Sequence, residues 1–352
     1  MFNILVRLFL FLSLTVVVQD RVNGDENVAL TGLMILSAAS FFIKPKRRVE
    51  IKYLIAPFFF ALITLFLSKY VVVMASALKV FAALCAIKAI GENFDMNLKT
   101  VGLWMIGFIL ISLSFVGWQY TGQEPFFFPA FQEVAGMSFR PWILGCSVVL
   151  AIPFLVAIHP ALFFLAFPLL WVSHSTVCMI TGILAAGIVL IQRRKQISNL
   201  WFFLAIPALI LFSQTDKFDH NRIEVWVNSF KHLENIWIGR GLGAWAHSAF
   251  IHQATKPDGE ILVWLWAHNE FYQYLFEQGI FGLSLLLVSV FFIFKSATSS
   301  VTRSALLSLV MLSMVHPVFH WGKVSVFAIL IISIAIAEGS ERSSENERLV
   351  GS

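Results

Sequence analysis

The sequence predicts an all-α, polytopic membrane helix bundle of about twelve transmembrane helices with a cap of short helices on the outer face. Of its 352 residues, 59% are hydrophobic and 13% are charged, whereas soluble domains carry about 25% charged residues. The mean hydropathy is +0.82, and the apolar residues fall into runs near the length of about 20 that a spanning helix needs. The composition therefore excludes a water-soluble domain. The small net charge of +5 does not suggest a nucleic-acid-binding face.

The apolar runs divide the chain into four parts. We expect an N-terminal transmembrane region over 1–213 with about nine helices, a large outside loop over 214–270, C-terminal transmembrane helices over 271–337, and a disordered cytoplasmic tail over 338–352. A cleavage site of the A-x-A type is missing after the first run, which favours a retained helix over a signal peptide. The predicted spans are 2–18, 28–43, 51–67, 70–90, 101–118, 141–158, 160–173, 175–191, 199–213, 271–294, 303–317 and 324–337.

The distribution of basic residues predicts the orientation. Cytoplasmic loops are enriched in Lys and Arg, and with twelve spans the basic stretches at 44–48, 192–195 and 295–303 fall on one side of the membrane. Segments 119–140 and 214–270 then lie outside. The latter holds five of the nine histidines and is too rich in aromatic residues for a disordered loop.

Within this outside loop, "HNRIEVWVNSF" has the spacing of an amphipathic helix lying on the membrane surface. Asp219 or Asn221 would cap it. Its apolar face would consist of Ile223, Trp226, Val227 and Phe230.

His268 is the main candidate for chemistry. An imidazole with a pKa near 6.5 can act as a general base close to neutral pH. A helix beginning at this point would place His268, Tyr272 and Leu275 on one face. The alternative is a histidine at the membrane interface beside Trp264 and Trp266, which are ordinary headgroup anchors.

Three arginines in the outside segments could bind phosphate, because the planar guanidinium suits bidentate recognition of such groups. They are Arg140, Arg222 and Arg240. Each could instead be a solvated charge or reach toward lipid headgroups.

The glycines and cysteines suggest structural rather than cofactor roles. "GRGLG" (239–243) has no preceding strand and is not a dinucleotide fingerprint, so we interpret it as a tight turn that passes close to a ligand or a helix. The three cysteines show no CxxC spacing, which argues against a zinc site or a disulfide framework. The pair Asp216 and Asp219 is weak evidence for a cation. We therefore expect no metal and no cofactor.

Taken in order, these motifs resemble the bacterial O-antigen ligase and O-antigen polymerase family. The resemblance covers residues 214–290 and rests on Arg222 one turn before Trp226, the glycines at 239–243, His268 with Asn269, and "EQGIFGL" at 277–283. It implies a GT-C-like, polytopic glycosyltransferase in the bacterial inner membrane with its active site facing the periplasm.

The same resemblance implies a reaction and a set of site residues. A glycan carried on undecaprenyl diphosphate would be transferred, with inversion and without a metal, to the hydroxyl of lipid A-core or of another lipid-linked glycan. His268 would be the base, Arg222 and Arg140 would neutralise the diphosphate with Arg240 as a further candidate, and Asn269, Glu270, Gln273, Trp226, Gly241 and Gly279 would support them.

Two questions stay open at this level. A ligase and a polymerase differ only in the acceptor, which the sequence does not specify. A polytopic transporter without covalent chemistry is the other class, but few ionisable groups lie within the spans, whereas ion-coupled transporters need them at the midplane.

Overall fold

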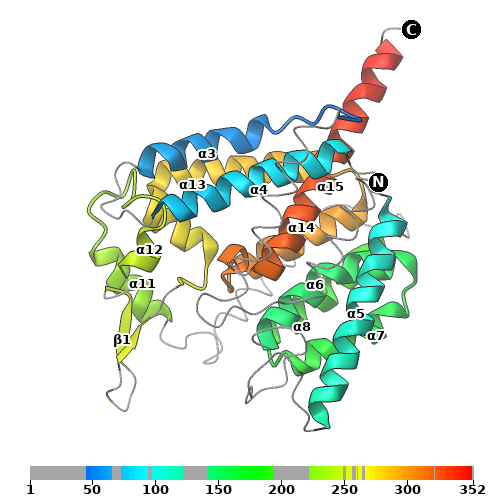
Figure 1. The fold of residues 1–352 in the computed structure, drawn as a ribbon, viewed down its shortest axis with the longest axis horizontal. Helices are drawn as coiled ribbons and strands as arrows, with labels where there is room; N and C mark the ends of the chain where they lie inside the picture. Colours follow the sequence, from blue (N-terminus) through cyan, green and yellow to red (C-terminus); the bar gives the residue numbers. More distant parts are fainter. Residues whose placement is uncertain are drawn as a thin grey trace.

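The computed structural model of the chain describes residues 45–65, 73–93, 97–121, 141–193, 222–248, 251–255, 259, 261–263, 266–320 and 322–350. These residues are mainly helical (Figure 1). The elements are α3 (Lys52–Leu65), α4 (Val73–Asn93), α5 (Leu98–Tyr120), α6 (Pro141–Ile158), α7 (Leu162–Val172), α8 (Thr176–Arg193), α11 (Arg222–Lys231), α12 (Ala244–His247), β1 (Gln253–Thr255), β2 (Ile261–Val263), α13 (Glu270–Ser296), α14 (Ser300–Ser313), η2 (Val318–His320) and α15 (Gly322–Val350).

Four of the described helices are long and apolar enough to cross a membrane: Leu98–Tyr120, Pro141–Ile158, Glu270–Ser296 and Val324–Ser344. Shorter apolar helices cover Lys52–Thr64, Leu162–Val172, Thr176–Gln192 and Ser300–Ser313. The predicted runs from 51–67 to 175–191 and from 271–294 to 324–337 all coincide with helices. The runs at 2–18, 28–43 and 199–213 lie outside the described residues.

The helices pack as two groups around α14 and α15 (Figure 1). In one group α13 packs on α3, and α3 packs on α4. In the other α6 contacts α5, α7 and α8, and its side chains from Ile143 to Val156 are buried. By contrast, α13 exposes Phe281, Leu287, Val288 and Phe291, which suits a helix face in contact with lipid.

A small cap stands at the N-terminal end of α13. It contains α11, α12 and an antiparallel ladder in which Gln253 pairs with Val263, a pairing that the sequence did not predict. Its own core consists of Val225, Ala244, Trp245, Ile251, Ala267 and Phe276.

The amphipathic helix predicted in the outside loop is present as α11. Its proposed caps, Asp219 and Asn221, lie outside the described residues. Ile223, Val227 and Phe230 are 46–51% exposed, whereas Arg222, Val225 and Ser229 are buried.

The C-terminal segment differs from the expectation of a disordered tail, because α15 continues to Val350. Its Glu338 carboxylate accepts hydrogen bonds from the backbone N–H groups of Thr298 (2.7 Å) and Ser299 (3.0 Å) at the start of α14. Such a carboxylate satisfies free donors at a helix N-terminus. Glu341 also pairs with Arg47, so contacts that lie far away in the sequence stabilise this helical extension.

Candidate functional site

A break in α13 organises the site. Gly279 has φ 64° and ψ −170°, which interrupts the helix. The loop 236–241 crosses the break and supplies the missing hydrogen bonds. The N–H groups of Arg240 and Gly241 donate to the carbonyls of Phe276 (3.1 Å) and Glu277 (2.8 Å), and those of Ile280 and Phe281 donate to Ile236 (2.9 Å) and Trp237 (3.1 Å). These four hydrogen bonds between the loop and α13 keep the backbone groups at the break paired, as a membrane environment requires.

Glycine is needed on both sides of this crossing. A Cβ at Gly279 would lie 2.3 Å from the carbonyl carbon of Trp237, and one at Gly239 would lie 2.5 Å from the backbone of Glu277. Gly239, Gly241 and Gly243 also have positive φ angles, which favour glycine. The prediction that "GRGLG" lets the backbone pass close to a helix is confirmed.

Glu277 and Gln273 then connect the loop to the segment that carries His268. The buried Glu277 carboxylate accepts from the N–H groups of Gly243 (2.8 Å) and Trp245 (3.3 Å) and from the Gln273 amide (3.3 Å). The Gln273 side-chain oxygen in turn accepts from the N–H of Ala267 (3.2 Å). Two side chains one helical turn apart therefore position the residue before His268.

His268 itself precedes α13 and is not part of it. Asn269 is the N-cap, and its side chain accepts from the N–H of Tyr272 at 2.9 Å. The expectation that His268 shares a helical face with Tyr272 and Leu275 is therefore wrong, because Asn269 is the cap and the helix begins only at Glu270. His268 has φ +52°, a left-handed conformation that is uncommon outside glycine and is often found at functional sites.

The start of α11 is attached to the same segment. The Trp226 indole N–H donates to the carbonyl of Ala267 at 2.8 Å, and its ring stacks on Tyr272 with centroids 5.3 Å apart. One turn earlier, the Arg222 side chain is buried and donates through Nη1 to the carbonyl of Val315 at 3.2 Å. The Arg–Trp pair thus joins the His268 segment to the turn after α14.

That turn, 314–320, was not among the sequence candidates. The ring of Trp142 in α6 stacks on His316 (centroids 5.0 Å apart) and lies 6.3 Å from the ring of His268. Glu270 accepts from the N–H of Phe319 at 2.7 Å and lies 3.5 Å from His320. Two histidines in "HPVFH" at the end of an apolar run are the signal that could have indicated it.

The other two candidate arginines are Arg240, which the structure describes, and Arg140, which it does not. Arg240 donates to the carbonyl of His232 (3.2 Å), pairs with Glu234 (3.4 Å) and lies over the ring of Phe276. Among the described residues these contacts hold Arg240 within its own loop and against α13. Arg140 lies outside the described residues.

Next to Trp142, the fold brings together Cys146, Cys178 and His316, whose ligand atoms all lie within 4.8 Å of one another. Sequence spacing argued against a zinc site, but these side chains meet through packing of distant helices. They are the described residues best suited to hold a metal ion.

No protein-family model and no curated protein matches this chain. The functional assignment therefore depends on the residues of the site and on the family resemblance of its motifs.

His252 is a buried histidine in the cap whose pKa is lowered by its surroundings. It is fully buried, stacks on Trp245 with centroids 3.8 Å apart, and its Nδ1 lies 2.7 Å from the Ser229 hydroxyl. Because that hydroxyl donates to the carbonyl of Val225 (2.6 Å), it accepts from Nδ1. Burial, aided by the positive charge of Arg240, lowers the pKa of His252 from 6.5 to about 4.

We expect acidification to destabilise the folded protein through His252. The unfolded state binds the proton near pH 6.5 and the folded state only near pH 4, so stability is lost as the pH falls between these values. At about 1.4 kcal/mol per pKa unit, the loss approaches about 3 kcal/mol at pH 4. The thermal midpoint of His252→Gln in detergent should therefore fall less steeply from pH 7 to pH 4 than that of the wild type. His174→Asn, at an exposed position, should keep the wild-type slope, and equal slopes in all three proteins would contradict this role.

Proposed function

We propose that this protein is a membrane glycosyltransferase that transfers a glycan from undecaprenyl diphosphate to an acceptor hydroxyl. One observation carries the proposal. Arg222 and His268 are far apart in the sequence, yet Trp226 bonds to the residue before His268. Arg222 donates to the carbonyl of Val315, and Trp142, which stacks on His316, lies 6.3 Å from the ring of His268. A base and a cation that are connected through the same turn and the same tryptophan fit attack by a hydroxyl with departure of a diphosphate.

In the proposed reaction the acceptor oxygen attacks the anomeric carbon as the bond from that carbon to the diphosphate breaks, so the configuration inverts. His268 takes the hydroxyl proton. Arg222, buried in a site where charges interact more strongly than in water, stabilises the negative charge that develops on the diphosphate. Arg140, two positions before Trp142 in the sequence, is the proposed second arginine. Arg240 becomes the weakest diphosphate candidate, because its guanidinium already bonds to the carbonyl of His232 and pairs with Glu234.

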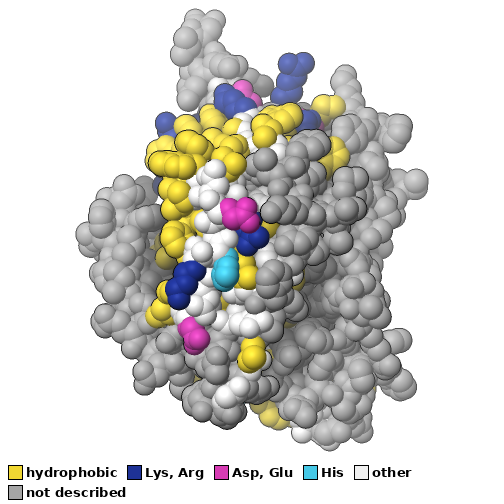
Figure 2. Space-filling view, turned by 90° about the vertical axis from the view of Figure 1, so that its left-hand side faces the viewer, with side chains coloured by type: hydrophobic (Ala, Val, Ile, Leu, Met, Phe, Trp, Pro, Cys, Tyr) yellow, Lys and Arg dark blue, Asp and Glu magenta, His cyan; other side chains and the backbone are white. Residues whose placement is uncertain are grey.

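The proposed setting is the bacterial inner membrane, with twelve spans and the cap on the periplasmic face. The exposed apolar side chains of Ile223, Val227 and Phe230 on α11 would rest on the membrane surface. Trp237, 54% exposed, would join them. Figure 2 shows hydrophobic side chains gathered on this face beside a few charged side chains and a histidine, a mixture that suits the headgroup region.

The position of the loop break supports the same setting. A helix interruption at membrane depth is tolerated where protein covers it, as loop 236–241 covers the break at Gly279. Beside the Gly239–Gly279 crossing, the buried polar pair Gln273 and Glu277 bonds to the cap through Gly243 and Ala267. The cap is thereby held firmly against the end of α13.

Deletion of the gene in its host, with lipopolysaccharide analysed on a gel, tests the proposal and separates its two forms. Loss of a polymerase leaves a single repeat on the core, whereas loss of a ligase leaves bare core and polymer retained on the carrier lipid. A plasmid copy carrying Arg222→Ala should restore membrane levels but reduce transfer by about 10²–10³-fold. Unchanged surface polysaccharide in both the deletion and the variant would refute the glycosyltransferase assignment.

A further inference from the structure

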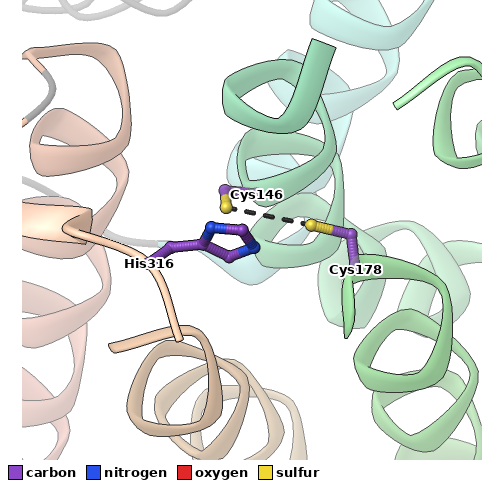
Figure 3. Close-up of side chains that lie close together, drawn as sticks. All are labelled: Cys146, Cys178 and His316. Carbon is purple, nitrogen blue, oxygen red and sulfur yellow. Dashed lines mark hydrogen bonds between the residues drawn. The ribbon is translucent and has the colours of Figure 1, made fainter. Parts of the chain in front are cut away.

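Three sulfur and nitrogen ligands converge from three separate segments (Figure 3). Cys146 lies near the start of α6, Cys178 lies in the first turn of α8, and His316 lies in the turn between α14 and η2. The two Sγ atoms are 3.8 Å apart, and the imidazole is turned toward them. Both cysteines are fully buried and His316 is 7% exposed.

The sulfur separation matches metal coordination better than it matches a disulfide. With Zn–S bonds of about 2.3 Å at a tetrahedral ion, two sulfur ligands lie about 3.8 Å apart. A disulfide would need the sulfurs to approach to about 2.05 Å. The pair therefore already has the spacing of two zinc ligands.

Charge and neighbouring contacts support the same interpretation. Two thiolates and one Zn²⁺ sum to zero charge, which reduces the cost of placing them in a buried site. The Ser175 hydroxyl lies 3.4 Å from Nε2 of His316 and accepts from the N–H of Cys178 (3.3 Å). Trp142 stacks on the imidazole with an interplanar angle of 5°. Such surrounding contacts fix the orientation of a ligating histidine.

We propose that Cys146, Cys178 and His316 bind one Zn²⁺ ion, with the Ser175 hydroxyl or a water molecule completing four-fold coordination. Binding releases the two thiol protons to solvent. The ion would tie α6, α8 and the 314–320 turn together and so hold Trp142 and Val315, which contact His268 and Arg222. This role is structural and goes beyond the proposed transfer reaction, in which the metal takes no part.

Metal analysis of the purified full-length protein tests the site. After incubation with Zn²⁺ and removal of the excess, we expect about one zinc per chain. Cys146→Ser and Cys178→Ser should each weaken Zn²⁺ affinity by about 100-fold or more, since they remove a ligand rather than an outer contact. Cys85→Ser is the matched control, because Cys85 lies half-buried on α4 outside the cluster, and it should bind like the wild type.

Cobalt provides a test that needs no variant to fold. Co²⁺ bound by the wild type should give thiolate-to-metal charge-transfer absorption, which Zn²⁺ should abolish by displacement. Absence of that absorption, zinc content below stoichiometry in the wild type, or equal loss of zinc in Cys85→Ser would overturn the proposal. A Cys146–Cys178 disulfide in protein purified without reductant would overturn it too. Because each readout is metal binding, the result is independent of whether the protein transfers glycans.

Discussion

Replacement of His268 by asparagine is expected to lower glycan transfer by about 10²–10⁴-fold, the usual contribution of a general base. Asparagine tolerates the left-handed backbone that His268 adopts at φ +52°, but its amide cannot take up the acceptor proton. The loss should therefore appear in the rate of transfer from an undecaprenyl-diphosphate donor, while the amount of protein in the membrane and its thermal midpoint stay near those of the wild type.

His174 provides a closely matched control for this variant. It is the other non-glycine residue with a positive φ among the described residues, at +50°, but it is exposed at the end of α7. His174→Asn repeats the same chemical change in the same backbone conformation and should keep wild-type activity. Full activity in His268→Asn, or an equal loss in both variants, would count against His268 as the base.

Gly279→Ala is expected to prevent stable folding of the cap on α13. An alanine would have to adopt φ +64° and ψ −170°, a region that is used almost only by glycine and costs about 1–3 kcal/mol, and its Cβ would lie 2.3 Å from the backbone of Trp237. The clash would separate loop 236–241 from the break and remove its backbone hydrogen bonds. Each unpaired buried group costs about 1–3 kcal/mol, so we expect a sharp drop in folded yield and in the thermal midpoint in detergent.

Gly187→Ala makes the same change where no such constraint exists. A Cβ at Gly187, in α8, meets nothing within 4 Å, and alanine favours a helix over glycine by about 1 kcal/mol. This variant should be as stable as the wild type or slightly more stable. If Gly279→Ala were equally well tolerated, the close crossing of the loop and α13 would not describe the folded protein.

Motifs in the sequence predicted a large part of this site. The Arg222–Trp226 spacing, the glycine turn and the His-Asn pair all lie in the region where α11, loop 236–241 and the start of α13 meet. The predicted span at 271–294 begins within one residue of α13, but the grouping of His268 with Tyr272 on the helix was wrong, because an N-cap is defined by one side-chain hydrogen bond that periodicity does not reveal. It also missed the β1–β2 ladder, whose strands are three residues each and carry little pattern.

Sequence alone determined the membrane class and the limits of most helices, because hydrophobic length is a local property that must match the thickness of a bilayer. It also indicated the close approach at the glycines, since few other residues adopt positive φ. Only the tertiary structure decided which distant groups meet: Trp142 with His316 and His268, Arg222 with Val315, and Cys146 with Cys178. The reason is physical, because such meetings depend on how whole helices pack against one another, and the linear spacing of the residues carries no record of that packing.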